Sequence, residues 1–258
     1  MWRPVGLLPG VGTLGKLGPI LELPFTQRSH LFVMDYSEYF RQLADYYNNS
    51  RLTSKVMTGA AEIRADFNQE GSWVRHCAEH LKLTLAKRRV LEVACGGGRW
   101  TQFIADVADR VVATDPCPRL LEFGRKLGLP NTEWVECDAF SLDKIKETFS
   151  GACHINFINH VPLELLPTFI NKLHQKLEPG STVFWATQRF RGNPSESWYE
   201  KPETGDMVSL RHHDDGRPIE VVDTFFTEDL VRGLFIGRAR RLEITLKGWW
   251  LWARYQVA

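Results

Sequence analysis

The feature that most constrains this chain is an apolar segment that runs directly into three consecutive glycines. Residues 90–93 are apolar except for Glu92 and lack the alternation of a half-exposed strand, which predicts a central strand covered on both faces. Because glycine has no Cβ, residues 96–98 can adopt positive φ and let a ligand lie against bare backbone, beside the free N–H groups of the next helix. The segment therefore predicts a strand, a tight turn and a helix that together hold a cofactor.

The turn departs from the glycine fingerprint of dinucleotide-binding proteins, whose third glycine would fall where this chain has Thr101. It resembles instead the first motif of the class I S-adenosylmethionine-dependent methyltransferases, in which an acidic residue and a small residue precede Gly-x-Gly. The matching positions are Glu92, Ala94, Gly96 and Gly98. The resemblance implies that the cofactor is S-adenosylmethionine, that Glu92 lies near its methionine ammonium, and that these four residues and Thr101 belong to the cofactor site.

The next predicted strand, residues 110–115, ends in a carboxylate. A single carboxylate can accept hydrogen bonds from both hydroxyls of a ribose, and the sites for NAD and for S-adenosylmethionine both use such an acid. Asp115, followed by Pro116, is therefore predicted to bind the cofactor ribose. A helix cap ahead of Pro116 is the alternative role, and the two roles are compatible.

The adenine end of the cofactor site is implied by the resemblance. Beyond the third predicted strand, residues 133–136, methyltransferases place an acid and a backbone N–H at the adenine edge. The matching residues are Asp138 and Ala139. A helix is expected over residues 141–148, and a fourth strand follows within residues 152–162.

The fourth strand leads to Asn159 and His160. Ligands of open α/β sheets lie beyond the carboxyl ends of the strands, so both residues are expected near the transferred methyl group, with Asn159 as a cofactor contact. His160 is the predicted catalytic base, because only histidine titrates near neutrality without help. A capping or structural histidine is the alternative.

An aromatic helix is predicted ahead of the first strand, because aromatic side chains between residues 35 and 48 recur on one helical face. In the methyltransferases that this chain resembles, such a helix folds over the cofactor as a lid. The resemblance implies contacts from Tyr47 to the cofactor and from Tyr39 to the substrate; an ordinary buried stripe is the alternative. We assign residues 34–84 to this helical lid, and residues 1–33, which prolines interrupt, to a flexible N-terminal extension.

Residues 189–225 are polar and longer than a typical connection, so we interpret them as an insertion on the substrate side. Within them, two strand-like runs flank a turn at residues 214–216, which predicts a hairpin. Four basic residues surround its tip: Arg211, His212, His213 and Arg217. Such a cluster can bind a carboxylate, phosphonate or phosphate through charge-assisted hydrogen bonds, and a solvated polar tip is the alternative.

The remaining pattern predicts a helix over residues 165–177, a strand at 182–187 and a final pair of strands at 241–246 and 249–255. Class I methyltransferases end an otherwise parallel sheet with such an antiparallel hairpin. The expected fold class is α/β: a doubly wound, mostly parallel seven-stranded sheet with strand order 3-2-1-4-5-7-6, N-terminal lid helices and an inserted hairpin. The expected methyltransferase domain covers residues 34–258.

Composition favours small-molecule chemistry. The formal net charge of +1 gives no field that would recruit nucleic acid or an anionic membrane. The five cysteines are widely spaced, without a Cys-x-x-Cys pair or a zinc-ligand pattern with the histidines. We therefore expect reduced thiols, a cytoplasmic protein and no metal, and the sequence leaves the oligomeric state open.

The predicted function is methyl transfer from S-adenosylmethionine to an oxygen of a small acceptor. The chain resembles the small-molecule methyltransferases of natural-product pathways, which include an O-methyltransferase that esterifies a phosphonate in dehydrophos biosynthesis. The acceptor is anionic if the basic hairpin tip binds it. Two alternatives stay open: an NAD-dependent oxidoreductase, although the chain has no Tyr-x-x-x-Lys pair, and a non-catalytic partner subunit that keeps the fold.

Overall fold

The computed structural model describes residues 36–49, 63–69, 71–188 and 197–258. The chain divides into two compact units, residues 1–39 and residues 40–258. The predicted N-terminal extension lies outside the described residues, as does the first part of the predicted lid up to Asp35. Every strand among the described residues belongs to the second unit.

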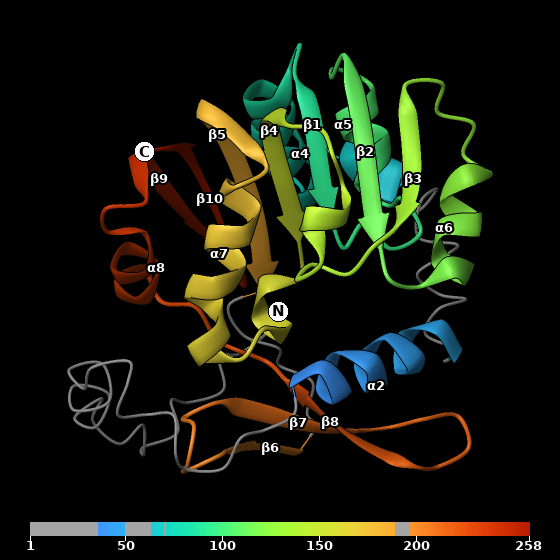
Figure 1. Ribbon diagram of the computed structural model, residues 1–258, viewed down its shortest axis with the longest axis vertical. Coiled ribbons are helices and arrows are strands. Elements are labelled where there is room, and N and C mark those ends of the chain that lie inside the picture. Colours follow the sequence, from blue (N-terminus) through green and yellow to red (C-terminus); the bar gives the residue numbers. More distant parts are fainter. Residues whose placement is uncertain (1–35, 50–62, 70, 189–196) are drawn as a thin grey trace, which may run out of the picture. The chain divides into compact units, whose positions relative to one another are not determined.

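Seven strands form one sheet in the order β3-β2-β1-β4-β5-β10-β9 (Figure 1). They are β1 (Arg89–Val93), β2 (Arg110–Asp115), β3 (Thr132–Glu136), β4 (Phe149–Ile155), β5 (Leu177–Gln188), β9 (Ala239–Lys247) and β10 (Trp250–Val257). The first five strands of this order pair in parallel, whereas β10 is antiparallel to both β5 and β9. This confirms the predicted mostly parallel sheet, with β9 and β10 as its sixth and seventh strands.

Strand β1 lies at the centre of the parallel part, between β2 and β4. Val90 pairs with Val111 of β2 and with Gly151 of β4, and the four residues after Arg89 are buried. An apolar strand without alternation is thus covered on both faces, as the sequence predicts. The carboxyl end of β1 then opens into the glycine turn.

Helices cover both faces of the sheet (Figure 1). The helices on the two faces are α4 (Trp73–Leu85), α5 (Thr101–Ala105), α6 (Pro118–Arg125), α7 (Leu166–His174) and α8 (Glu228–Phe235), whereas α2 (Tyr36–Asn49) lies beyond the carboxyl ends of the strands (Figure 1). Helices α4 and α5 bury their apolar faces in one core cluster, and α7 and α8 bury theirs in a second cluster on the other side. Side chains cap the N-termini of α4 and α8, since Ser72 accepts from the Arg75 N–H and Thr227 from the Leu230 N–H.

The helix predicted over residues 141–148 is wrong. The chain forms a single 3-10 turn, η2 (Leu142–Lys144), before β4 begins. Leu142 and Ile145 are both buried, and the Ile145 N–H donates to the Leu142 carbonyl at 3.1 Å, the i to i+3 bond of a 3-10 turn. Within the predicted helical lid, residues 63–68 are also helical.

A second sheet of three antiparallel strands lies in the predicted insertion. It consists of β6 (Ser197–Glu200), β7 (Met207–His212) and β8 (Pro218–Val222). The hairpin of β7 and β8 was predicted, with its turn at residues 214–216, whereas β6 was not. Two further 3-10 turns, η3 (Ile158–His160) and η4 (Leu163–Leu165), link β4 to α7.

The η3 and η4 turns also connect the small sheet to the large one. The Thr224 N–H donates to the Asn159 carbonyl at 2.8 Å, and the Leu163 N–H donates to Asp206 Oδ1 at 2.8 Å. The inserted hairpin is therefore anchored beside the turn that carries His160. Within the described ranges, no helix is both long enough and apolar enough to cross a membrane.

We predict that Phe169→Ala lowers the free energy of unfolding by about 3–5 kcal/mol, the usual range for removing a buried aromatic side chain. Phe169 is fully buried on α7, and its ring contacts those of Phe157 and His154 at centroid distances of 5.1 and 5.3 Å. Urea unfolding followed by circular dichroism measures the loss. Leu83→Ala is the control, because Leu83 is 74% exposed on α4 and its removal should change stability by about 0.5 kcal/mol or less. Similar losses in both variants would contradict this assignment of the core.

Candidate active site

The glycine turn after β1 uses its glycines in two different ways. Gly96 and Gly98 both have positive φ, of 56° and 84°. A Cβ at Gly98 would lie 2.6 Å from the Trp134 ring and 2.7 Å from the Leu127 side chain, so glycine is required there for packing. A Cβ at Gly96 would meet no atom of the described residues within 4 Å. Gly96 therefore presents open backbone at the carboxyl end of β1, as a ligand-binding turn needs.

Asp115 holds this turn in place from the end of β2. One carboxylate oxygen accepts the Gly96 N–H at 2.8 Å, and the other accepts the Cys117 N–H at 2.9 Å. Burial raises the pKa of Asp115, and these two backbone hydrogen bonds partly offset the rise. Each oxygen keeps a further lone pair, so the predicted bonds to ribose hydroxyls remain compatible with this anchoring role. Pro116 lies in the chain between Asp115 and Cys117.

Glu92 is the second buried carboxyl group of the turn. Its Oε2 atom is buried without a hydrogen-bond partner among the described residues. Burial raises the pKa of Glu92 to about 8, with an opposing contribution from the Thr101 hydroxyl and a smaller raising one from Asp115. A buried carboxyl oxygen that lacks a partner fits a cationic group, and the ammonium of a methionine moiety would supply both charge and donors.

The structure places the other predicted cofactor residues at the same end of the sheet. Ala94 is the first residue after β1 and has a φ of 55°, unusual for a residue other than glycine. Asp138 and Ala139 follow β3, and Asp138 accepts the Phe140 N–H at 2.8 Å. The intervening Cys137 N–H donates to the Asp115 carbonyl at 3.2 Å, which ties this segment to the end of β2. Their contacts to a cofactor stay a prediction.

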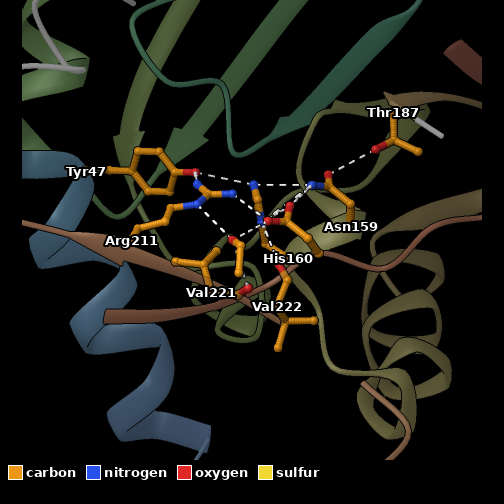
Figure 2. A network of polar contacts seen from close by, with 9 residues as sticks. Tyr47, Asn159, His160, Thr187, Arg211, Val221 and Val222 are labelled. Atoms are coloured by element: carbon orange, nitrogen blue, oxygen red, sulfur yellow. Dashed lines mark hydrogen bonds and ion pairs between the residues drawn. The ribbon is translucent and has the colours of Figure 1, made fainter. Parts of the chain in front are cut away.

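A second polar cluster joins α2, the η3 turn and the inserted hairpin (Figure 2). This His160 network consists of Tyr47, Asn159, His160, Thr187, Ser209, Arg211 and Asp223. His160 Nδ1 lies 2.8 Å from the Val222 carbonyl, and the Tyr47 hydroxyl lies 3.3 Å from Nε2. Because a carbonyl only accepts, Nδ1 carries the hydrogen, and Nε2 accepts from Tyr47 when the ring is neutral.

Asn159 and Asp223 hold the far side of the network. The Thr187 hydroxyl donates to Asn159 Oδ1 at 3.0 Å, and Asn159 Nδ2 donates to Asp223 Oδ1 at 3.2 Å. The same Asp223 oxygen lies 3.4 Å from His160 Nδ1. All four side chains are buried, so these polar groups satisfy one another away from water.

Arg211 belongs to this network rather than to the hairpin tip. Its side chain is buried on β7, where it forms an ion pair with Asp223 at 2.6 Å and donates to the Tyr47 hydroxyl at 3.2 Å. Burial opposes the charge of the guanidinium, but Tyr47 and Asp223 together raise the pKa of Arg211 above its ordinary value. The carboxylate of Asp223 balances the positive charge that was predicted to hold an anion.

The other predicted substrate residues are not brought together with Arg211. His212 is exposed, because successive side chains on β7 point to opposite faces. His213 packs against Tyr46, with ring centroids 5.3 Å apart, and the exposed Arg217 pairs with Asp215 at 2.7 Å in the turn itself. Tyr39 lies on α2 in the first unit of the chain. The binding of an acceptor by these residues stays a prediction.

Sequence reasoning missed Asp223, Ser209 and Thr187. Asp223 follows the apolar end of β8, and Ser209 shares a face of β7 with Arg211, a two-residue spacing that would have placed both side chains inward. No sequence signal pairs Asp223 with Asn159, which is 64 residues away. Among the described residues, no group of three or more His, Cys, Asp and Glu side chains could hold a metal ion.

Comparisons with known proteins concern the sheet and its glycine turn. Residues 90–180 match the family model of a methyltransferase domain. The chain is 31% identical over 111 residues to a ubiquinone biosynthesis O-methyltransferase of Xanthomonas oryzae pv. oryzae, over 41% of this chain and 45% of that protein. A protein of the same name from Nitrosococcus oceani is 27% identical over 108 residues, or 40% and 45% of the two chains. The chain thus matches less than half the length of these curated relatives.

Solved structures extend the likeness to most of the chain. The DhpI–SAM–HEP complex has a TM-score of 0.63 at 21% identity, over 84% of this chain and 97% of that chain. The 1,6-didemethyltoxoflavin-N1-methyltransferase of Burkholderia thailandensis, solved with S-adenosylhomocysteine, has a TM-score of 0.57 at 18% identity, over 88% and 92% of the two chains. At these identities the likeness shows a shared fold.

We predict that S-adenosylhomocysteine binding at pH 7 releases about one proton per site, because its ammonium requires Glu92 to ionise. The raised pKa of about 8 leaves this carboxyl group largely protonated beforehand. Affinity should therefore increase with pH and level off above about pH 8. Calorimetry in buffers of different ionisation enthalpy counts the protons.

Glu92→Gln should remove this proton release and flatten the pH dependence. The matched control is Glu178→Gln, because Glu178 is an exposed residue of β5 that pairs with Arg89. Equal proton release in wild type and Glu92→Gln would show that the ammonium lies elsewhere.

Proposed function

We propose that this chain transfers the methyl group of S-adenosylmethionine to an oxygen of a small acceptor. The chain has the class I methyltransferase fold and carries a methyltransferase domain. The observation that carries this proposal is the glycine turn. Gly96 is open to a ligand, Asp115 fixes it, and Glu92 offers a buried oxygen without a partner. These three features suit the ribose and the methionine end of the cofactor.

The chemistry asks little of the protein beyond orientation. When bound, S-adenosylmethionine supplies a methyl group on a sulfonium leaving group. Glu92 would hold the methionine ammonium and Asp115 the ribose, and Asp138 and Ala139 would contact the adenine edge. The protein must then align the acceptor oxygen with the methyl carbon and exclude water. Asn159 and His160, beyond the carboxyl end of β4, line the acceptor side.

An oxygen acceptor is supported by the relatives and by the site. The curated relatives are ubiquinone biosynthesis O-methyltransferases, although the chain matches 45% of their length. His160, whose Nε2 faces the Tyr47 hydroxyl, is suited to take the proton of a hydroxyl group. The acceptor is a small molecule in this proposal, and neither nucleic acid nor a membrane is part of it.

The rival enzyme class is an NAD-dependent oxidoreductase. Thr101 replaces the third glycine of the dinucleotide fingerprint and begins α5, where its side chain is buried. The antiparallel β9–β10 pair at the edge of the sheet also fits the methyltransferase fold. Calorimetric titration with S-adenosylhomocysteine and, in parallel, with NAD separates the two classes, and NAD binding alone would overturn the proposal.

We predict that Asp115→Ala weakens S-adenosylhomocysteine binding by about 30- to 150-fold, equivalent to about 2–3 kcal/mol for lost charge-assisted hydrogen bonds and a loosened turn. Asp109→Ala serves as the control. Asp109 is an exposed aspartate just before the first residue of β2, whereas Asp115 is the last residue of that strand. Isothermal calorimetry gives both dissociation constants. If a folded Asp115→Ala protein binds as tightly as wild type, Asp115 has only its anchoring role.

We predict that Gly96→Val abolishes cofactor binding while the protein stays folded. The branched side chain would enter the open space beside the turn, and valine is strained at a φ of 56°. Thermal unfolding and calorimetry on the same sample distinguish lost binding from lost structure. A folded variant with normal affinity would mean that the cofactor binds at another place.

A further inference from the structure

We propose that Asp223 is the positioning residue that makes His160 a proton acceptor for methyl transfer, and that the acceptor served by this arrangement is a neutral hydroxyl compound. The inference rests on the proposed methyl transfer and adds to it a substrate class and a role for a residue of the inserted hairpin. It is carried by the contacts that described residues make within the His160 network.

Two acceptors on the Nδ1 side orient the His160 ring. The Val222 carbonyl at 2.8 Å and Asp223 Oδ1 at 3.4 Å both lie on the Nδ1 side of the ring. Two acceptors on one side keep the hydrogen on Nδ1 and leave the lone pair of Nε2 directed away from them. Because Asp223 follows β8 directly, the hairpin determines which nitrogen of His160 is basic.

The Tyr47 hydroxyl is close to His160 Nε2. The Tyr47 hydroxyl lies 3.3 Å from Nε2 and 3.2 Å from Arg211 Nη1. The phenolic oxygen therefore accepts a hydrogen bond from the Arg211 guanidinium and lies within hydrogen-bond distance of His160 Nε2. This geometry lets the Tyr47 oxygen relay a proton from an acceptor hydroxyl to His160.

The charges in the His160 network balance. The ionisable groups that face His160 from the described elements are Tyr47 on α2, Arg211 on β7 and Asp223 after β8. The charges of Arg211 and Asp223 cancel across an ion pair of 2.6 Å, in which Ser209 also donates to Asp223 at 2.8 Å. The network thus keeps no unbalanced positive charge for an anionic acceptor, whereas a neutral hydroxyl finds a proton acceptor there.

The proposed transfer balances as follows. The acceptor O–H bond breaks as its proton passes to the Tyr47 oxygen and the proton of Tyr47 passes to His160 Nε2. The acceptor oxygen forms a bond to the methyl carbon with the freed electron pair, and the electron pair of the methyl–sulfur bond goes to sulfur. One positive charge moves from the sulfonium to the imidazolium, which later releases the proton to water.

The test is nitrogen-15 NMR of the histidine rings in the full chain, with the His160 signals assigned by their loss in His160→Gln. In wild type, neutral His160 should carry its hydrogen on Nδ1. Asp223→Asn removes a carboxylate that favours the imidazolium, so it should lower the pKa of His160 by about one unit or more. Arg211→Gln removes a cation and should shift the pKa in the opposite direction, and it provides an independent arm if Asp223→Asn does not fold.

The control for this test is Glu220→Gln, which should leave the His160 titration unchanged. Glu220 lies on the exposed face of β8 and pairs with Lys201 at 2.5 Å. A hydrogen on Nε2 in wild type, or a pKa that responds to neither Asp223→Asn nor Arg211→Gln, would overturn the positioning role.

The acceptor class is tested on protein saturated with S-adenosylhomocysteine, by adding phenols and alcohols and then the matching carboxylic acids. The His160 signals should shift with neutral hydroxyl compounds and not with carboxylates. A response to carboxylates alone, or to no neutral compound, would overturn the substrate class. Calorimetric titration of the same samples with S-adenosylhomocysteine distinguishes failure of this inference from failure of the proposed methyl transfer. A protein that does not bind S-adenosylhomocysteine would count against methyl transfer itself.

Discussion

The candidate cofactor site depends on the carboxylate of Asp115. It joins the Gly96 N–H of the turn after β1 to the Cys117 N–H just before α6, at 2.8 and 2.9 Å. The parallel pairing of β1 with β2 places it there, because Glu92 pairs with Ala113 and the two strands end side by side. Without this carboxylate, two backbone donors would lose their partner and the glycine turn would lose its anchor.

Electrostatics separates the cofactor side of the site from the acceptor side. On the cofactor side, burial raises the pKa values of both Glu92 and Asp115, and a cationic ligand would stabilise their ionised forms. On the acceptor side, Arg211 and Asp223 cancel each other's charge beside His160. A positively charged cofactor and a neutral acceptor are the ligands that this distribution of charge suits.

The strands that carry the predicted cofactor residues were predictable, because each lies within a short segment that carries its own signal. Strand order then brings the ends of β1, β2 and β3 together. The His160 network was not predictable, because Tyr47 and His160 are 113 residues apart and meet only through packing. Arg211 was misplaced at the hairpin tip because its charge was weighed above the strand alternation that turns it inward beside Ser209. The prediction of a helix over residues 141–148 was wrong, because the chain forms only a 3-10 turn over Leu142–Lys144 before β4 begins at Phe149.

The most direct test of the central claim is a crystal structure of the wild-type chain with S-adenosylhomocysteine. The account predicts the methionine ammonium within hydrogen-bond distance of Glu92 Oε2, the ribose hydroxyls on Asp115, and the backbone of Gly96 against the ligand. The sulfur should face Asn159 and His160. A ligand bound away from the carboxyl ends of β1 and β2, or one that leaves Glu92 Oε2 without a partner, would contradict it.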